Sequence, residues 1–412
     1  MADQYSLNCL ISSFLPYNGT VMTNKKQQRI LTTAFYYISF IGLGLASGVL
    51  GPSLLRLADN TSATIAQASS ILLFHAFGYM VGAVLGGRSY DRVAGNPVMS
   101  VMLVIIAASL AFTPVTNLLW VLVALMFVLG VSQGSLDVGG NTLLVWVHGN
   151  KVGPFMNGLH LFFGFGAFAA PILVAQAMRI QDNLNWAYWG MALFMLIPAA
   201  GLALVKSPPR KSESDEVGKT GGHSNKLLLG MIVVFYLFYV GMEVGFTGWI
   251  FTYATTSNLL AEVSAAYATS LFWGTFTLGR LVSIPIAMKL PSRQVLTIDL
   301  AGCFASILIL LIWPASVTAL WISIAGTGLF AASIFPTMIT FAENRMHLTG
   351  KTTSLFFVGA STGGMFFPWL IGQCYASVGP RMVPLTIIFS TAFLSLIFVI
   401  LVKKYPGKSA AH

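Results

Sequence analysis

The chain has 412 residues, of which 56% are hydrophobic and only 8% are charged. Because an ordinary soluble domain is about 25% charged, this composition excludes both a water-soluble globule and a disordered chain. The net charge of +10 does not indicate a nucleic-acid-binding protein, since so few charges cannot cover one face of so apolar a chain.

Twelve apolar runs are long enough to cross a bilayer, which takes about 20 helical residues each. Helices are required because unpaired peptide groups are not tolerated in lipid, and the short alternating segments of a membrane β-barrel are missing. The sequence therefore predicts an all-α membrane protein with twelve transmembrane helices. In chain order the runs cover residues 30–57, 66–87, 97–115, 118–147, 152–179, 185–205, 227–256, 261–287, 293–313, 317–345, 351–378 and 381–402.

Positive residues divide unequally between the two sides that these spans define. Of the 22 Lys and Arg residues, 18 fall in segment 1–29, in the loops after even-numbered spans or in the tail 403–412, and three fall on the other side. Because cytoplasmic loops carry the excess of Lys and Arg, we predict that both termini are cytoplasmic. We expect an integral protein of the plasma (inner) membrane.

One long polar connection, residues 206–226, divides the chain in two. Its Pro, Gly, Ser and mixed charges are typical of a flexible linker, so we predict six-helix bundles over 30–205 and 227–402. The halves repeat at an offset of 197 residues, a pattern that secondary transporters use to bind substrate between two parallel repeats. The coinciding positions are Gly44, Gly48, Gly51, Gly82, Gly153, Gly166 and Pro171, which match Gly241, Gly245, Gly248, Gly279, Gly350, Gly363 and Pro368.

The loop after the second span contains Gly87, Asp91 and Arg92. Together with the repeat, it resembles the signature loop of the major facilitator superfamily, although it has one extra residue before Gly95 and lacks the final basic pair. The resemblance implies that Gly87, Asp91 and Arg92 form a gating and packing element on the cytoplasmic side. The alternative is a basic loop that only caps a helix.

A narrower resemblance covers most of the chain. The segment from Asp137 to Asn141 is similar to the fucose–proton symporter branch, which has Glu, three residues and Asn at this place. The segments Gly241–Trp249 and Thr269–Arg280 are similar to the sodium-dependent glucose transporter branch. The resemblance implies a small sugar as substrate and a cation as coupling ion. The first-span Asp of the fucose branch is missing here, and an acid stands in span 7 instead, as Glu243.

Two acids are candidates for ion coupling, because charges at bilayer depth cost roughly 3 kcal/mol and need a partner or a purpose. Asp137 and Asn141 lie one turn apart, where they can ligate Na⁺, bind sugar hydroxyls or carry a proton. The alternative for Asp137 is a structural pair with an Arg. Glu243 lies near the middle of span 7 with Thr247 one turn further on, and its neighbouring glycines leave room for an ion or simply serve helix packing.

Arg280 lies nearer the cytoplasmic end of span 8. At that depth it can neutralise Asp137 or Glu343. The ion pair would either form and break as the cytoplasmic gate closes and opens, or stay in place as a structural pair, and the sequence leaves both open.

Several polar and aromatic residues are candidate substrate contacts. His75 on span 2, Asn157 with His160 on span 5 and Thr247 on span 7 are suitable partners for hydroxyl groups, although a lone His in a membrane helix also serves packing. Trp249 and Trp273 can stack on the apolar face of a sugar ring, and the alternative for Trp249 is the interfacial aromatic belt.

We therefore predict a secondary active transporter that moves a small sugar by Na⁺ or H⁺ symport with alternating access; the sugar rests on the resemblance. The alternatives are a proton-driven exporter of drugs or other metabolites and a transporter-like sensor that does not turn over. The sequence has no P-loop, metal-ligand spacing or catalytic set. We expect no cofactor besides the coupling ion, no enzymatic activity, no nucleic-acid partner and a functional monomer in the lipid bilayer.

Overall fold

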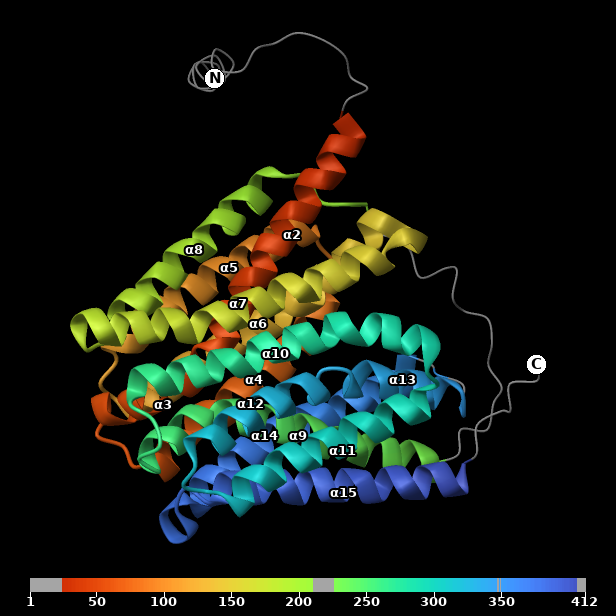
Figure 1. The fold of residues 1–412 in the computed structure, drawn as a ribbon. Coiled ribbons are helices and arrows are strands. Elements are labelled where there is room, and N and C mark those ends of the chain that lie inside the picture. Colours follow the sequence, from red (N-terminus) through yellow and green to blue (C-terminus); the bar gives the residue numbers. More distant parts are fainter. Residues whose placement is uncertain (1–23, 210–225, 347, 349, 406–412) are drawn as a thin grey trace.

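Helices make up almost the whole of the computed structural model (Figure 1), which describes residues 24–209, 226–346, 348 and 350–405. Twelve segments are long and apolar enough to cross a membrane, and the described residues contain no strand. The predicted all-α membrane fold is confirmed. Most of the predicted N-terminal segment 1–29, linker 206–226 and tail 403–412 lies outside the described residues.

The helices of the first half run up to Leu204 and those of the second half begin at Lys226. In the first half they are α2 (Asn24–Gly48), α3 (Leu50–Asn60), α4 (Ile65–Tyr90), α5 (Gly95–Phe112), α6 (Leu119–His148), α7 (Gly153–Gln181) and α8 (Asn185–Leu204). In the second half they are α9 (Lys226–Thr256), α10 (Glu262–Lys289), α11 (Ser292–Ile312), α12 (Val317–Ala331), α13 (Ile334–Glu343), α14 (Gly350–Val378) and α15 (Met382–Lys404).

Spans 1 and 10 differ from the prediction, because each consists of two helices rather than one. In both, a proline is the third residue of the second helix: Pro52 in α3 and Pro336 in α13. A proline has no N–H to give to the carbonyl four residues earlier, and it is tolerated in a first turn, where that N–H has no helical partner anyway. The prolines inside α7 and α14 leave those helices continuous, so a proline permits such a break without forcing it.

Two glycine pairs of the sequence repeat have the same structural role in both halves. A Cβ added to Gly82 on α4 would lie 1.9 Å from the Val131 carbonyl oxygen on α6, and its counterpart Gly279 meets α12 in the same way. A Cβ on Gly166 would lie 2.0 Å from the Ile41 carbonyl oxygen. A Cβ added to its counterpart Gly363 would lie 1.8 Å from the Leu237 carbonyl oxygen. At these two pairs the repeat therefore preserves backbone-to-backbone helix contacts that any side chain would disrupt.

The two halves meet along three helix pairs, α4 with α14, α7 with α10, and α3 with α9. In Figure 1 most of the first half forms the upper layer and most of the second half the lower one, with α3 and α4 of the first half beside the helices of the second. We call the end of the bundle where α8 ends and α9 begins the linker face. The end that carries the turn between α3 and α4 is the opposite face.

Candidate functional site

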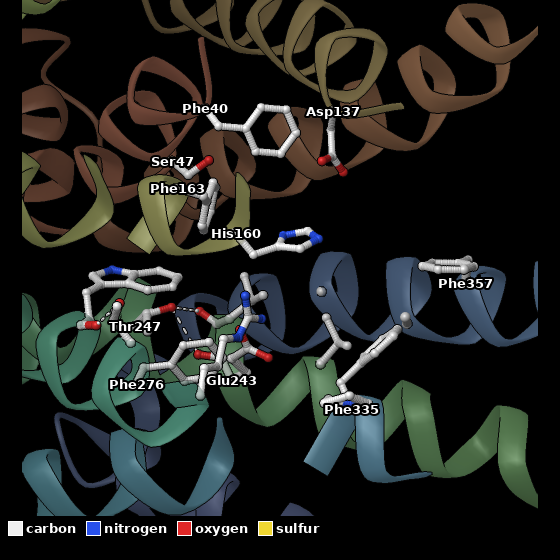
Figure 2. Close-up of a pocket in the computed structure, with 18 of the residues that line it drawn as sticks. Phe40, Ser47, Asp137, His160, Phe163, Glu243, Thr247, Phe276, Phe335 and Phe357 are labelled. Atoms are coloured by element: carbon white, nitrogen blue, oxygen red, sulfur yellow. Dashed lines mark hydrogen bonds between the residues drawn. The ribbon is translucent and has the colours of Figure 1, made fainter. Parts of the chain in front are cut away.

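A cavity of about 1050 Å³ lies between the two halves and is lined by residues from both. Asp137, His160 and Phe163 face it from the first half, and Glu243, Thr247 and Phe276 face it from the second (Figure 2). Its lining extends to Leu290, Ser292 and Thr340 near the linker face. The cavity therefore occupies the place between repeats where transporters of parallel repeats bind substrate.

The opposite face is closed by contacts that join the two halves. Gly51 of α3 lies so close to α9 that an added Cβ would stand 2.7 Å from the Thr247 carbonyl oxygen. Gln373 of α14 donates to the carbonyl oxygen of Ala66 at 2.9 Å and to the Ser69 hydroxyl at 3.2 Å, both on α4.

An ion-pair cluster adds to this closure. Arg56 of α3 lies 2.8 Å from Glu262 of α10 and 2.6 Å from Asp182, which follows α7. The Arg56–Glu262 pair connects the halves, whereas the Arg56–Asp182 pair stays within the first half.

Asp137 is held by two hydrogen-bond donors on its own side of the cavity. The Tyr79 hydroxyl donates to its Oδ2 at 2.7 Å, and the Asn141 amide donates to its Oδ1 at 3.0 Å and to its carbonyl oxygen at 2.9 Å. Both oxygens of the carboxylate are thus occupied, an arrangement that stabilises its charged form. The amide protons of Asn141 are used here as well, which leaves its oxygen as the group it can offer a ligand.

Glu243 has a different environment on the facing half. Tyr239, one turn earlier on α9, is a polar neighbour of its carboxyl group. The Tyr239 hydroxyl has a single proton and donates it to the carbonyl oxygen of Ala331, the last residue of α12, at 2.9 Å. Glu243 is therefore held less completely than Asp137 by the residues that the structure describes.

Arg280 carries the positive charge of the cavity. It acts electrostatically on both Asp137 and Glu243, yet it makes no ion pair within 4 Å of any carboxylate among the described residues. Its guanidinium lies 4.7 Å from the centre of the Phe276 ring. The predicted pairs of Arg280 with Asp137 and with Glu343 are not formed in this structure.

The remaining cavity residues combine hydroxyl partners with aromatic surfaces. His75, Asn157, His160, Thr247 and Trp273 all line the cavity, as predicted for contacts with a substrate. The Trp273 ring lies edge-on to Phe163 of the other half, with ring centres 6.1 Å apart. Flat apolar surfaces next to polar groups suit a ligand with one apolar face and a polar rim.

Five predicted site residues do not reach the cavity. Trp249 is fully buried: its indole N–H donates to the Pro368 carbonyl oxygen at 2.9 Å, and its ring stacks on Tyr375. It is thus part of the packing between α9 and α14, neither a cavity surface nor an interfacial residue. The others, Gly87, Asp91, Arg92 and Glu343, lie at helix ends on the linker face.

Sequence reasoning missed several polar partners. Gln133 lies one helical turn before Asp137, and Tyr239 lies one turn before Glu243. This spacing in the sequence could have indicated both residues. Asp299 is a buried acid inside α11 that accepts a hydrogen bond from the Ser333 hydroxyl at the α12–α13 break. The sequence could have indicated Asp299, because it is an acid within the ninth apolar run.

Comparisons with known proteins agree with this architecture. The family described as the Major Facilitator Superfamily matches residues 36–368. The mouse protein named sodium-dependent glucose transporter 1A is 30% identical over 404 residues, covering 89% of this chain and 95% of that protein. Among solved structures, the nucleoside transporter NupG has a TM-score of 0.74 at 12% identity, covering 90% of this chain and 99% of that one. A D-xylose–proton symporter has a TM-score of 0.70 at 12% identity, covering 89% and 97%.

Proposed function

Because the chain belongs to the Major Facilitator Superfamily, and is an integral membrane transporter rather than an enzyme, we propose that it carries a small sugar by symport with a cation. The cavity carries this proposal, since it offers hydroxyl partners and aromatic faces between two halves that can rock against each other. The relative named as a sodium-dependent glucose transporter supports both the sugar and Na⁺ as the coupling ion.

Glu243 is the coupling residue in this mechanism. Asp137 already receives hydrogen bonds on both oxygens, whereas the carboxyl of Glu243 has no donor available from Tyr239. A proton or Na⁺ bound to Glu243 neutralises its carboxylate. The free-energy cost of enclosing this acid away from solvent, as the carrier changes state, is then lower. Asp137 then acts as a fixed acceptor that holds Tyr79 and Asn141 at the sugar site.

The structure corresponds to one end state of alternating access. With the termini in the cytoplasm, the linker face is the inner side and the contacts of Arg56, Gly51 and Gln373 close the outer side. The cavity is then inward-facing, ready to release sugar and cation. Import at the plasma membrane requires these outer contacts to break and the linker-face ends to close in the opposite state.

The substrate lies between His160 and Asn157 of α7 and Trp273 of α10. His160 and Asn157 are hydroxyl partners from the first half, and Trp273 provides a stacking surface from the second. His75, Thr247 and the oxygen of Asn141 complete the polar lining. A sugar bound in this way contacts both halves at once, which is what allows its binding to favour the movement of one half against the other.

Counterflow of labelled monosaccharides in proteoliposomes tests this function. Vesicles are assayed with a Na⁺ gradient, with a proton gradient and with neither, and empty vesicles serve as the control. We expect exchange of one monosaccharide under all conditions and uphill accumulation under only one gradient. If no monosaccharide exchanges under any condition, the substrate assignment is wrong.

A second candidate is proton-driven export of a larger, more apolar metabolite. One observation favours it: the cavity of about 1050 Å³ lies at the upper end of the range for drug-sized ligands, and Phe40, Phe163, Phe276, Phe335 and Phe357 line it. Inhibition of sugar counterflow by hydrophobic cations, with uptake of those cations driven by an outward proton gradient, would favour this candidate over sugar import.

A further inference from the structure

Helices α4 and α6 form a tightly packed pair that carries two polar contacts one turn apart. Gly130 and Gly134 of α6 lie against the backbone of α4, where an added Cβ would stand 2.1 Å from the His75 carbonyl oxygen and 2.0 Å from that of Tyr79. The side chains of His75 and Gln133 meet at 2.7 Å, and one turn further on Tyr79 and Asp137 also meet at 2.7 Å. The first contact, between His75 and Gln133, has no part in the function proposed above.

Gln133 is unusual because it is buried without being satisfied. It is 0% exposed, its Oε1 is bonded to His75 Nε2, and its Nε2 has no hydrogen-bond partner among the described residues. An unpaired buried amide nitrogen is unfavourable, and an apolar side chain of the same length would fill this position without that penalty. The amide is therefore best explained by the hydrogen bond between its oxygen and His75.

The contact fixes which nitrogen of His75 carries the proton. An amide oxygen can only accept, so Nε2 of a neutral His75 must be the protonated nitrogen and Nδ1 must be the bare one. His75 lines the cavity, and its Nδ1 makes no hydrogen bond to the described residues. His75 accordingly keeps an unused hydrogen-bond acceptor on a residue that lines the cavity, and the close packing of α4 against α6 limits its movement.

We propose that Gln133 is a specificity-determining positioning residue: it holds His75 in the Nε2–H form so that Nδ1 accepts a hydrogen bond from one particular hydroxyl of the substrate. The part of this inference that concerns the sugar rests on the proposed function, whereas the part that concerns the tautomer does not. A ligand with an acceptor, such as a carbonyl or ether oxygen, at that position would face the lone pair of Nδ1 and be rejected.

The tautomer is tested first, without any substrate. The protein is labelled with ¹⁵N-histidine in lipid nanodiscs, and the signal of His75, one of six histidines, is identified by its loss in His75→Gln. We expect the wild type to show a protonated Nε2 and a bare Nδ1. Gln133→Met should mix the two tautomers, and Ser132→Ala, a buried neighbour on α6 that bonds only its own helix, should not. A protonated Nδ1 in the wild type, or an unchanged tautomer in Gln133→Met, overturns the proposal.

Specificity is tested with the transported sugar and its singly deoxygenated analogues. We expect Gln133→Met to weaken binding of the parent sugar about tenfold, the effect of one hydrogen bond, while leaving the rate at saturation close to that of the wild type. For one deoxy analogue the variant and the wild type should bind equally well. Equal weakening for every analogue would mean that Gln133 is only structural. If no sugar binds the wild type, the proposed function fails while the tautomer experiment still decides the role of Gln133.

Discussion

The two halves of the protein share the glycine contacts of two repeated positions, but the acids that face the cavity from each half have different surroundings. In the first half, Asp137 stands on the continuous helix α6 and receives hydrogen bonds from Tyr79 and Asn141. In the second half, the hydroxyl of Tyr239, one turn from Glu243, donates to the end of α12, where span 10 is broken. Asp137 is thus held by two donors, whereas the neighbouring hydroxyl of Glu243 is engaged with another helix.

The broken helices follow the same division. Position 334, where α13 begins, is the counterpart of Asp137 at the offset of 197, yet span 4 is continuous there and span 10 is interrupted. Conversely, span 1 is broken at Val49 whereas its counterpart α9 is continuous. The repeat therefore preserves the packing of helices and leaves each half free to place its break where its own site needs one.

The largest expected effect separates the two acids. Glu243→Gln keeps the shape of the side chain but cannot bind a proton or ligate Na⁺ as an anion, so we expect uphill accumulation of sugar to be abolished while counterflow continues. In Asp137→Asn the two donors lose their charged acceptor, and we expect sugar affinity to fall about tenfold with coupling retained. Accumulation and counterflow in the same proteoliposomes measure both.

The reverse result would contradict this comparison directly. If Asp137→Asn abolishes accumulation and Glu243→Gln does not, the first half holds the coupling ion. If both variants concentrate sugar uphill, neither acid couples transport. The intact counterflow of each variant serves as its control for folding.

The glycine contacts are expected to act alike in the two halves. Gly166→Ala and Gly363→Ala each place a methyl group within 2.0 Å of a carbonyl oxygen, so each should lower the free energy of unfolding by about 1–3 kcal/mol. Gly364→Ala is the matched control, because its new Cβ would stand 3.4 Å from its nearest neighbour. Thermal unfolding in detergent measures all three; a strong effect at one of the repeat glycines alone would mean that the halves do not share this contact.

The architecture could be predicted from the sequence because a bilayer constrains it so strongly. Continuous apolar runs of sufficient length have to be helices, and two of the glycine pairs at the offset of 197 mark close helix contacts that both halves contain. The breaks at Val49 and Ala332 could not be predicted, because the prolines inside α7 and α14 give the same local signal without a break.

The candidate site was predictable only in part, for a physical reason. The cost of burying charge singled out Asp137, Glu243 and Arg280, and all three line the cavity. Partners such as Tyr239 and Gln133 are recognisable only once two helices have been placed side by side. Trp249 was misleading for the same reason, since the helix face it occupies turns toward α14 rather than the cavity.

A smaller effect is expected where the break in span 10 meets Glu243. Tyr236 and Tyr239 both donate to carbonyl oxygens at the break, of Phe335 at 3.0 Å and Ala331 at 2.9 Å. Removing either hydroxyl should cost about 1 kcal/mol of stability, the usual value of one hydrogen bond. Only Tyr239 also lies next to the carboxyl of Glu243, so Tyr239→Phe alone should change the cation concentration for half-maximal uptake, by about fivefold, which corresponds to about 1 kcal/mol. An equal change in Tyr236→Phe would mean that the break, not Glu243, sets the ion dependence.

The smallest effect is expected at the outer ion pairs. Arg56 and Glu262 are 29% and 42% exposed in their side chains, and ion pairs this accessible contribute about 0.5 kcal/mol. Arg56→Gln should therefore raise the population open at the opposite face only roughly twofold.

The rate at which Ser69→Cys reacts with a water-soluble maleimide, in a chain without its three native cysteines, reports that population, because Ser69 is buried against Gly372 when the face is closed. Asp182→Asn should have less effect than Glu262→Gln, since only Glu262 belongs to the other half. If the two act equally, the pair between the halves has no special part in the closure. If Arg56→Gln leaves the rate unchanged, the ion pairs do not contribute to it and the contacts of Gly51 and Gln373 maintain the closed face.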